Sequence, residues 1–121
     1  MIWKVIFNLE FKPEFNTLPQ EVQNKIFALA EGLLSQLGPS LGRPHVDTLT
    51  GSKYPNMKEL RCTVANGVWR IAFAFDPDRQ AILLAGGSKS GVSEKRFYKA
   101  LITQADSRFD RHLERRRRRK R

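Results

Sequence analysis

Charged side chains that could bind a phosphate stand on three neighbouring apolar stretches of the sequence. Glu59 and Arg61 alternate with apolar residues in the first stretch, and Arg70 does so in the second. Successive side chains of a β-strand point to opposite faces, so two adjacent strands would present these three charges on one surface. We expect Lys89, which follows the third stretch, to join them there.

The stretch that contains Arg70 has one bulky face and one bare face. Its large side chains share a parity and are predicted to form core: Trp69, Ile71, Phe73 and Phe75. On the opposite parity, Arg70 is accompanied only by Ala72 and Ala74. Small residues beside a lone arginine would leave room for a flat ligand against the sheet.

This pattern suggests phosphate chemistry on RNA. Guanidinium groups bind phosphate through paired hydrogen bonds and stabilise the charge that develops on phosphorus during in-line attack. If the ribose 2′-hydroxyl is the attacking group, the site needs a base and an acid but no metal. Glu59, His45 and Tyr98 are the candidate proton carriers. The same residues could instead be structural, with the arginines exposed, Glu59 as their ion-pair partner, His45 bonded in its loop and Tyr98 packed on the core.

Other chemistries have little support in the residue pattern. The two histidines, His45 and His112, have no nearby cysteine and no dense carboxylate cluster, so we predict neither a metal site nor any other cofactor. The segment 86–91 lacks the register of a phosphate-binding loop, and no Gly-x-Ser-x-Gly motif is present. The single cysteine, Cys62, alternates inward with Leu60 and is predicted to be a buried apolar residue in a reducing cytoplasm.

Length and charge favour one domain followed by a basic tail. The chain has 121 residues and a net charge of +10, of which residues 111–121 contribute +7 from eight basic residues and one acid. We place a single domain at 1–113 and expect the tail, 114–121, to be disordered when free. The tail could attract nucleic acid independently of sequence or be a solvated extension without a role. We identify neither a membrane-spanning segment nor a secretion signal.

Hydrophobic periodicity predicts the order of the elements. We expect a strand at 2–9, a helical turn at 11–15, an amphipathic helix from Pro19 to Leu37, a long loop at 38–56, three antiparallel strands within 57–89, and an amphipathic helix from Glu94 to about Arg116. This order indicates an α+β fold in which a small antiparallel sheet carries its helices on one side.

Several motifs, taken in order, resemble toxins of the RelE/HigB superfamily, and in particular the phage-derived HigB-like branch. They are Leu41-Gly42-Arg43-Pro44-His45-Val46, Leu49-Thr50-Gly51-Ser52, Lys58-Glu59-Leu60-Arg61, Val68-Trp69-Arg70-Ile71-Ala72-Phe73 and Ile82-Leu83-Leu84-Ala85-Gly86-Gly87-Ser88-Lys89. The match covers roughly residues 2–113. The resemblance implies a sheet of three to four antiparallel strands with two main helices packed on it.

The resemblance also implies an activity and partners. Members of this superfamily cleave messenger RNA without a metal, usually on the translating ribosome, and are neutralised by a cognate antitoxin, commonly a helix-turn-helix protein in this branch. Two alternatives remain on the same scaffold. One is a toxin that inhibits gyrase, and the other is a phage-derived module that binds RNA or protein without catalysis.

Site residues follow from the resemblance position by position. Arg70 matches the strand arginine that contacts the scissile phosphate, Arg61 matches a basic residue on the preceding strand, and Lys89 and Tyr98 match a later basic residue and a C-terminal tyrosine. Glu59 stands where ribosome-dependent members have a lysine, so it could be a base, a spacer or an ion-pair partner. We expect Tyr98 or Glu59 to move protons. The basic or polar side chains expected to contact RNA are Lys58, His45, Lys95, Arg96, Arg115 and Arg116.

Overall fold

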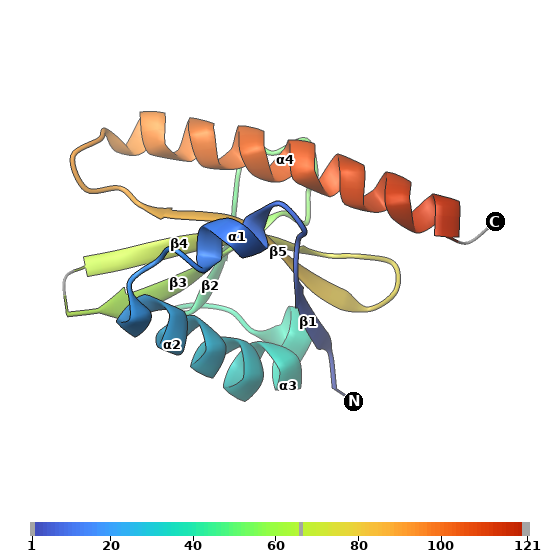
Figure 1. The fold of residues 1–121 in the computed structure, drawn as a ribbon, viewed down its shortest axis with the longest axis horizontal. Coiled ribbons are helices and arrows are strands. Elements are labelled where there is room, and N and C mark those ends of the chain that lie inside the picture. The colour runs from blue at the N-terminus through green and yellow to red at the C-terminus, as the bar shows by residue number, and fades with distance from the viewer. Residues whose placement is uncertain (1, 66, 120–121) are drawn as a thin grey trace.

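A five-stranded sheet forms the centre of the molecule (Figure 1). The computed structural model describes residues 2–65 and 67–119. The strands lie in the order β1 (Lys4–Phe7), β5 (Gln80–Ser88), β4 (Gly67–Phe75), β3 (Lys58–Val64) and β2 (Val46–Thr48). The helices are α1 (Phe11–Phe15), α2 (Gln20–Leu29), the π-helical η1 (Ala30–Leu34), α3 (Ser35–Leu37), the 3-10 turn η2 (Gly38–Ser40) and α4 (Glu94–Arg119). The predicted α+β class is confirmed, with five strands in place of three to four.

The strand predicted at 2–9 and one strand that was not predicted, β2, form the two edges of the sheet. β3, β4 and β5 form the expected antiparallel meander. β2, which lies within the segment predicted to be a loop, pairs antiparallel with β3. β1 pairs with β5 in parallel, from Lys4 opposite Gln80 to Phe7 opposite Leu83. The sheet is therefore mixed: its first strand runs parallel to its last, and the other neighbouring strands are antiparallel.

The two long helices cover opposite faces of the sheet, so the expectation that the helices share one side is wrong (Figure 1). Val22 and Ile26 of α2 pack with Ile71 and Phe73 of β4. These two strand residues belong to the face whose large side chains were predicted to form core. α4 covers the opposite face of β4, where Ala72 and Ala74 pack with Leu101, Ala105 and Phe109 of the helix. The small side chains of β4 accommodate a helix of this chain rather than a ligand.

The predicted helix from Pro19 to Leu37 is present but changes its winding. Regular α-helix ends at Leu29, the π-helical turn follows, and α3 completes the element. Gly38 then ends it with φ +53°, a backbone conformation that favours glycine. The indole ring of Trp3 lies directly against Gly38, where a Cβ atom would overlap it. β1 is thereby fastened to the end of the helical segment.

α4 extends to Arg119, so residues 114–119 are helical where a disordered tail was predicted. Lys120 and Arg121 lie outside the described residues. Within the helix, Glu114 pairs with Arg117 and Arg118 at distances of 2.5 and 3.4 Å. Arg116 binds both carboxylate oxygens of Asp78, at 2.8 and 3.1 Å, in the turn between β4 and β5. These contacts offset the repulsion among the arginines that motivated the prediction of disorder.

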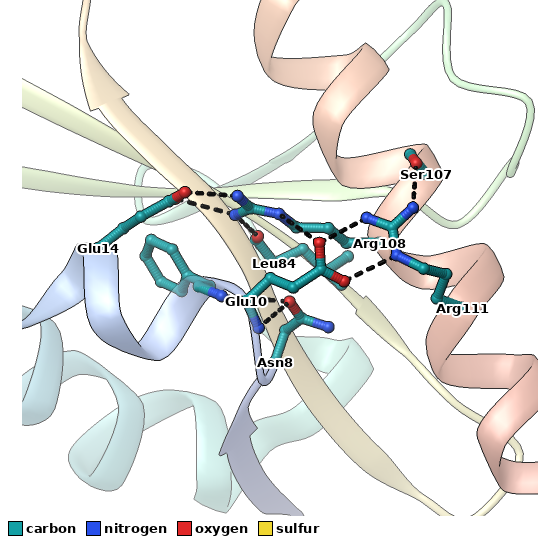
Figure 2. Close-up of polar contacts among 8 residues, drawn as sticks. Asn8, Glu10, Glu14, Leu84, Ser107, Arg108 and Arg111 are labelled. Carbon is teal, nitrogen blue, oxygen red and sulfur yellow. Dashed lines mark hydrogen bonds and ion pairs between the residues drawn. The ribbon is translucent and has the colours of Figure 1, made fainter.

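A buried arginine ties the middle of α4 to α1 (Figure 2). Arg108 donates to both carboxylate oxygens of Glu14, at 2.9 and 2.5 Å, and to the carbonyl oxygen of Leu84 at 2.8 Å. One helical turn later, Arg111 donates to both oxygens of Glu10, at 2.7 and 2.6 Å. Helix α4 is thus held at a fixed position along the sheet.

We predict that Gly38→Ala destabilises the protein by about 2–4 kcal/mol, because a Cβ at this φ is strained and collides with the Trp3 indole. Thermal or urea unfolding measures the change. Gly42→Ala is the control, because a Cβ there meets no atom within 4 Å, and its effect should stay under about 0.5 kcal/mol. Equal losses in the two variants would contradict this account.

We predict that Glu10 stabilises the protein at neutral pH and not in acid. The hydrogen bond from Arg111 holds the pKa of Glu10 below its ordinary 4.5. A carboxyl whose pKa is lowered by folding contributes stability above its unfolded pKa and loses that contribution as the pH falls through the folded value. The melting temperatures of wild type and Glu10→Gln should therefore differ at pH 7 and converge below pH 4.5.

The control for that experiment is Glu31→Gln, which makes the same chemical change at an exposed position of η1. Its melting temperature should follow wild type across the whole pH range. A constant difference between Glu10→Gln and wild type down to acid pH would show that the Glu10 side chain acts through packing rather than charge.

Candidate functional site

Four of the predicted site residues meet between the sheet and the first turns of α4. Strand alternation places Glu59 and Arg61 on the face of β3 that α4 covers. Arg70 lies directly across from Arg61 on β4. Tyr98 reaches down from α4 and completes the group. We call these residues, Glu59, Arg61, Arg70 and Tyr98, the β3–β4 cluster.

The carboxylate of Glu59 is the centre of the β3–β4 cluster. The residue is only 3% exposed, where strand parity alone predicted an open surface. The hydroxyl of Tyr98 donates to Oε1 at 2.8 Å, and Nε of Arg70 lies 3.6 Å from the same oxygen. Nη2 of Arg61 lies 3.4 Å from Oε2. A buried charge is tolerated only when it is paired and hydrogen-bonded, and these three groups provide both kinds of contact.

Arg70 is much less open than predicted, because its side chain is 11% exposed. Its guanidinium carbon lies 5.9 Å from the centre of the Tyr98 ring, within the range of a cation–π contact. The expected bare surface is absent here because the same small residues that flank Arg70 receive α4. Nε of Arg70 is buried without a hydrogen-bond partner among the described residues, as is Nε of Arg61.

The site opens to solvent through two separate hollows. Glu59, Arg61 and Tyr98 line one of about 290 Å³ together with Thr48, Leu49, Thr50 and Glu94. Arg70 and Lys89 line the other, of about 310 Å³, at the far end of β5. Arg61 is the more exposed arginine, at 37%. Any phosphate that enters from solvent would therefore meet Arg61 first.

Lys89 lies beside the β3–β4 cluster rather than within it. Its ammonium group is 3.7 Å from a carboxylate oxygen of Glu94, the first residue of α4. It shares its hollow with Arg70 but not with Glu59 or Tyr98. Lys89 is thus positioned to add positive charge next to Arg70, and a partly exposed ion pair of this kind exchanges partners at little cost.

The environment of Tyr98 favours its protonated form. Burial raises the pKa of Tyr98, and the hydrogen bond to the Glu59 carboxylate raises it further. A phenol with a raised pKa keeps its proton at neutral pH, so Tyr98 is a hydrogen donor in the β3–β4 cluster. Chemically, the cluster combines a proton donor, a proton acceptor and fixed positive charge.

Comparison with known proteins places the chain in a family. A family model described as phage derived protein Gp49-like matches residues 13–110. HigB3 of Mycobacterium tuberculosis (strain ATCC 25618 / H37Rv), named as a candidate toxin, is 53% identical over 81 residues, which cover 67% of this chain and 68% of HigB3. The chain belongs to the phage-derived Gp49-like family. It lies in the HigB-like branch of the RelE/HigB superfamily, as its motifs suggest.

A second relative and a solved structure agree with this placement. HigB2 of the same organism, also named as a candidate toxin, is 46% identical over 99 residues, which cover 81% of this Gp49-like chain. The chain spans about half of HigB2, 48% of its length. A variant of the E. coli toxin RelE in the free state, with two arginines replaced by alanine, shares the fold with a TM-score of 0.54. It is 13% identical, and the match covers 85% of this chain and 96% of that chain.

The remaining predicted RNA contacts of the Gp49-like domain do not join the β3–β4 cluster. Lys58 has the opposite strand parity and donates to the Thr48 hydroxyl at 3.1 Å. His45 meets Arg61 through the backbone, where its carbonyl oxygen accepts the Arg61 N–H at 2.8 Å. Both residues neighbour the cluster, Lys58 in sequence and His45 through its backbone hydrogen bond to Arg61, but their side chains have no described contact with it.

The four basic residues predicted on α4 fall at its two ends. Lys95 and Arg96 are exposed in its first turns, near the β3–β4 cluster. Arg115 and Arg116 lie about 30 Å further along, at 1.5 Å per helical residue. Arg116 is tied to Asp78 as described above. A single nucleotide cannot contact both ends, so only an extended strand could use all four residues.

Sequence reasoning missed Thr48, Thr50 and Glu94, which line the same hollow as Glu59. The threonines fall in or beside strand β2, in the segment interpreted as a loop. Recognising β2 would have placed Asp47 opposite Glu59, and its carboxylate lies 3.8 Å from Nη2 of Arg61. The other tyrosine of the chain, Tyr54, does not line this hollow; it is bound to Asp110 of α4 and packs on Phe109. Burial and this bond raise its pKa to about 12.

Within residues 2–65 and 67–119, no three histidine, cysteine or carboxylate side chains gather closely enough to hold a metal ion. None of the helices in those ranges combines the length and apolar character needed to cross a lipid bilayer. The candidate site is therefore described by its arginines, glutamate and tyrosine.

We predict that Glu59→Gln lowers the pKa of Tyr98, because it removes the charge and strong acceptor that help to raise it. Ultraviolet titration of tyrosinate measures the change. A Tyr54→Phe background leaves Tyr98 as the single titrating tyrosine, since the chain has two. Glu94→Gln is the matched control, because Glu94 lines the same hollow without a described bond to Tyr98. An unchanged pKa in Glu59→Gln would refute the assigned hydrogen bond.

Proposed function

We propose that this protein is the toxin of a toxin–antitoxin pair and that it cleaves messenger RNA without a metal. One observation carries the proposal: the β3–β4 cluster joins a carboxylate, a phenol and two guanidinium groups at an opening to solvent. These are the groups that attack by a ribose 2′-hydroxyl requires. Membership of a family that includes HigB2 and HigB3, both named as candidate toxins, supports the assignment.

The proposed reaction has one covalent step. Glu59 takes the proton from the 2′-hydroxyl, whose oxygen attacks the adjacent phosphorus. The bond from phosphorus to the 5′-oxygen breaks, Tyr98 gives its proton to that oxygen, and the products are a 2′,3′-cyclic phosphate and a 5′-hydroxyl. The proton on Glu59 then returns to Tyr98 along the hydrogen bond of 2.8 Å that joins them.

The arginines have different roles in this scheme. Arg61, the exposed member, contacts the scissile phosphate and stabilises the charge that develops there. Arg70 lies beneath Tyr98 and balances the charge of Glu59, which positions the proton carriers. Lys89 supports the phosphate from the neighbouring hollow. The resemblance assigns the phosphate contact to Arg70, whereas this scheme assigns it to Arg61 and gives Arg70 a positioning role.

The proposal includes the cellular setting. The substrate is messenger RNA on the translating ribosome in the cytoplasm, and basic residues at the two ends of α4, Lys95, Arg115 and Arg116, contact RNA beyond the cleaved bond. Charge of this kind strengthens binding without selecting a sequence. A cognate antitoxin, proposed to be a helix-turn-helix protein, neutralises the toxin. No membrane or cofactor takes part.

We predict that Arg61→Ala reduces RNA cleavage by about 10²–10³-fold, the usual effect of removing one transition-state donor, while its melting temperature stays near wild type. Mapping transcript 5′ ends after brief induction measures cleavage in cells. Arg61 is preferred to Arg70 for this test because its side chain is 37% exposed, against 11% for Arg70, so its truncation disturbs the buried packing less.

The matched control is Arg43→Ala. Arg43 also binds Asp47, at 3.1 Å, but is 79% exposed and lines neither hollow of the site. This variant should retain cleavage and growth arrest. Full cleavage by Arg61→Ala would reject the site, and DNA breaks without RNA fragments after induction of wild type would favour gyrase inhibition instead.

A further inference from the structure

A second concave surface lies along α4, on the side away from Tyr98. It is a groove of about 890 Å³ whose floor includes Phe97, Ala100 and Leu101 of α4 and Gly86 of β5. Arg96 and Lys99 stand at its rim. The groove shares no lining residue with either hollow of the β3–β4 cluster. It is therefore distinct from the candidate catalytic site.

The groove runs beside a strand edge that has no strand partner among the described residues. β1 pairs with β5 only as far as Leu83, whereas β5 continues to Ser88. The carbonyl oxygen of Leu84 is occupied by Arg108. Ala85 is fully buried, whereas Gly86, Gly87 and Ser88 are partly exposed. Over these three residues β4 covers one side of β5, and alternate backbone groups point away from it. Such an edge can accept an added strand.

The positive charge at the rim of the groove favours an acidic partner. Arg96 and Lys99 are exposed on α4, and neither forms an ion pair within residues 2–65 and 67–119. Arg111, further along the groove, is by contrast neutralised by Glu10. The first two turns of α4 thus present uncompensated positive charge above an apolar floor.

We propose that this groove binds an extended acidic segment of a partner protein, which adds a strand to the free edge of β5. Backbone hydrogen bonds to the partly exposed residues 86–88 would hold the segment, and every second side chain would point toward α4. Apolar side chains at those positions would enter the floor, and flanking carboxylates would reach Arg96 and Lys99. The proposal does not depend on the nuclease chemistry.

The observations favour a polypeptide over a nucleic acid at this surface. A strand edge offers an alternating ladder of N–H and C=O groups, which another backbone matches and a phosphate chain does not. Among the described residues that line the groove, Phe97 is the single aromatic side chain, so successive bases would not find a series of rings on which to stack. Only the rim charge would suit both partners.

The test uses the full chain and the peptide acetyl-Glu-Thr-Val-Thr-Val-Thr-Glu-amide, in which both valines and both glutamates share one strand face. We expect it to shift the amide resonances of residues 86–88 and to slow their hydrogen exchange. The same peptide with lysine in place of glutamate should not bind. Lys99→Glu should weaken binding by about three- to tenfold, and Ala100→Trp, which fills the groove from an exposed position, should abolish it.

Lys25→Glu on α2 is the matched control, since it makes the same charge change on an exposed helix outside the groove. It should bind the acidic peptide as wild type does. The proposal is overturned if the acidic peptide leaves residues 86–88 unchanged, or if Lys25→Glu and Lys99→Glu weaken binding equally. It is also overturned if a uridine oligonucleotide, or a second copy of this chain, occupies the groove in competition with the peptide.

Discussion

The packing of α4 against the face of β4 that carries Ala72 and Ala74 is the constraint from which both proposed functional surfaces derive. Ala72 and Ala74 are small enough for the helix to lie close to the sheet, and Leu101, Ala105 and Phe109 fill the interface. This contact brings one side of α4 over Glu59 and leaves the other side facing the unpaired end of β5. A larger residue at Ala72 would separate the helix from both.

The electrostatics of the cluster follow from that packing. Two like charges stand directly across β3 and β4, an arrangement that is unfavourable in a sheet unless an opposite charge lies between them. Glu59 supplies that charge, and α4 shields Glu59 and Arg70 from water. The result is a compact arrangement with low net charge in its interior and one cation, Arg61, turned outward. Strong binding of a phosphate would have to compete with Glu59 for that cation.

Much of this architecture could be predicted from local patterns. The alternation in β4, the stripe of α2 and the spacing of α4 each repeat over several residues, and their burial confirms the assignment. The group of Glu59, Arg61 and Arg70 also follows from parity, because adjacent antiparallel strands keep their faces aligned.

The rest depends on contacts that no local pattern contains. Burial of Glu59 requires Tyr98, which is 39 positions away. The helical state of residues 114–119 depends on the bond between Arg116 and Asp78, and the parallel pairing of β1 depends on β5. Both faces of the sheet are apolar, so the pattern of the strands does not determine which face α4 covers. Each is a tertiary effect that overrides the local preference of the segment.

The parallel pairing of β1 with β5 has a consequence for synthesis of the chain. A strand made first remains without its neighbour until β5 has been translated, and Tyr98 follows later still. Contacts between distant segments form slowly, because closing the intervening chain has an entropic cost. A nascent chain that has emerged only as far as β5 lacks the phenol of the cluster, so the order of translation itself would delay activity until α4 has folded onto the sheet.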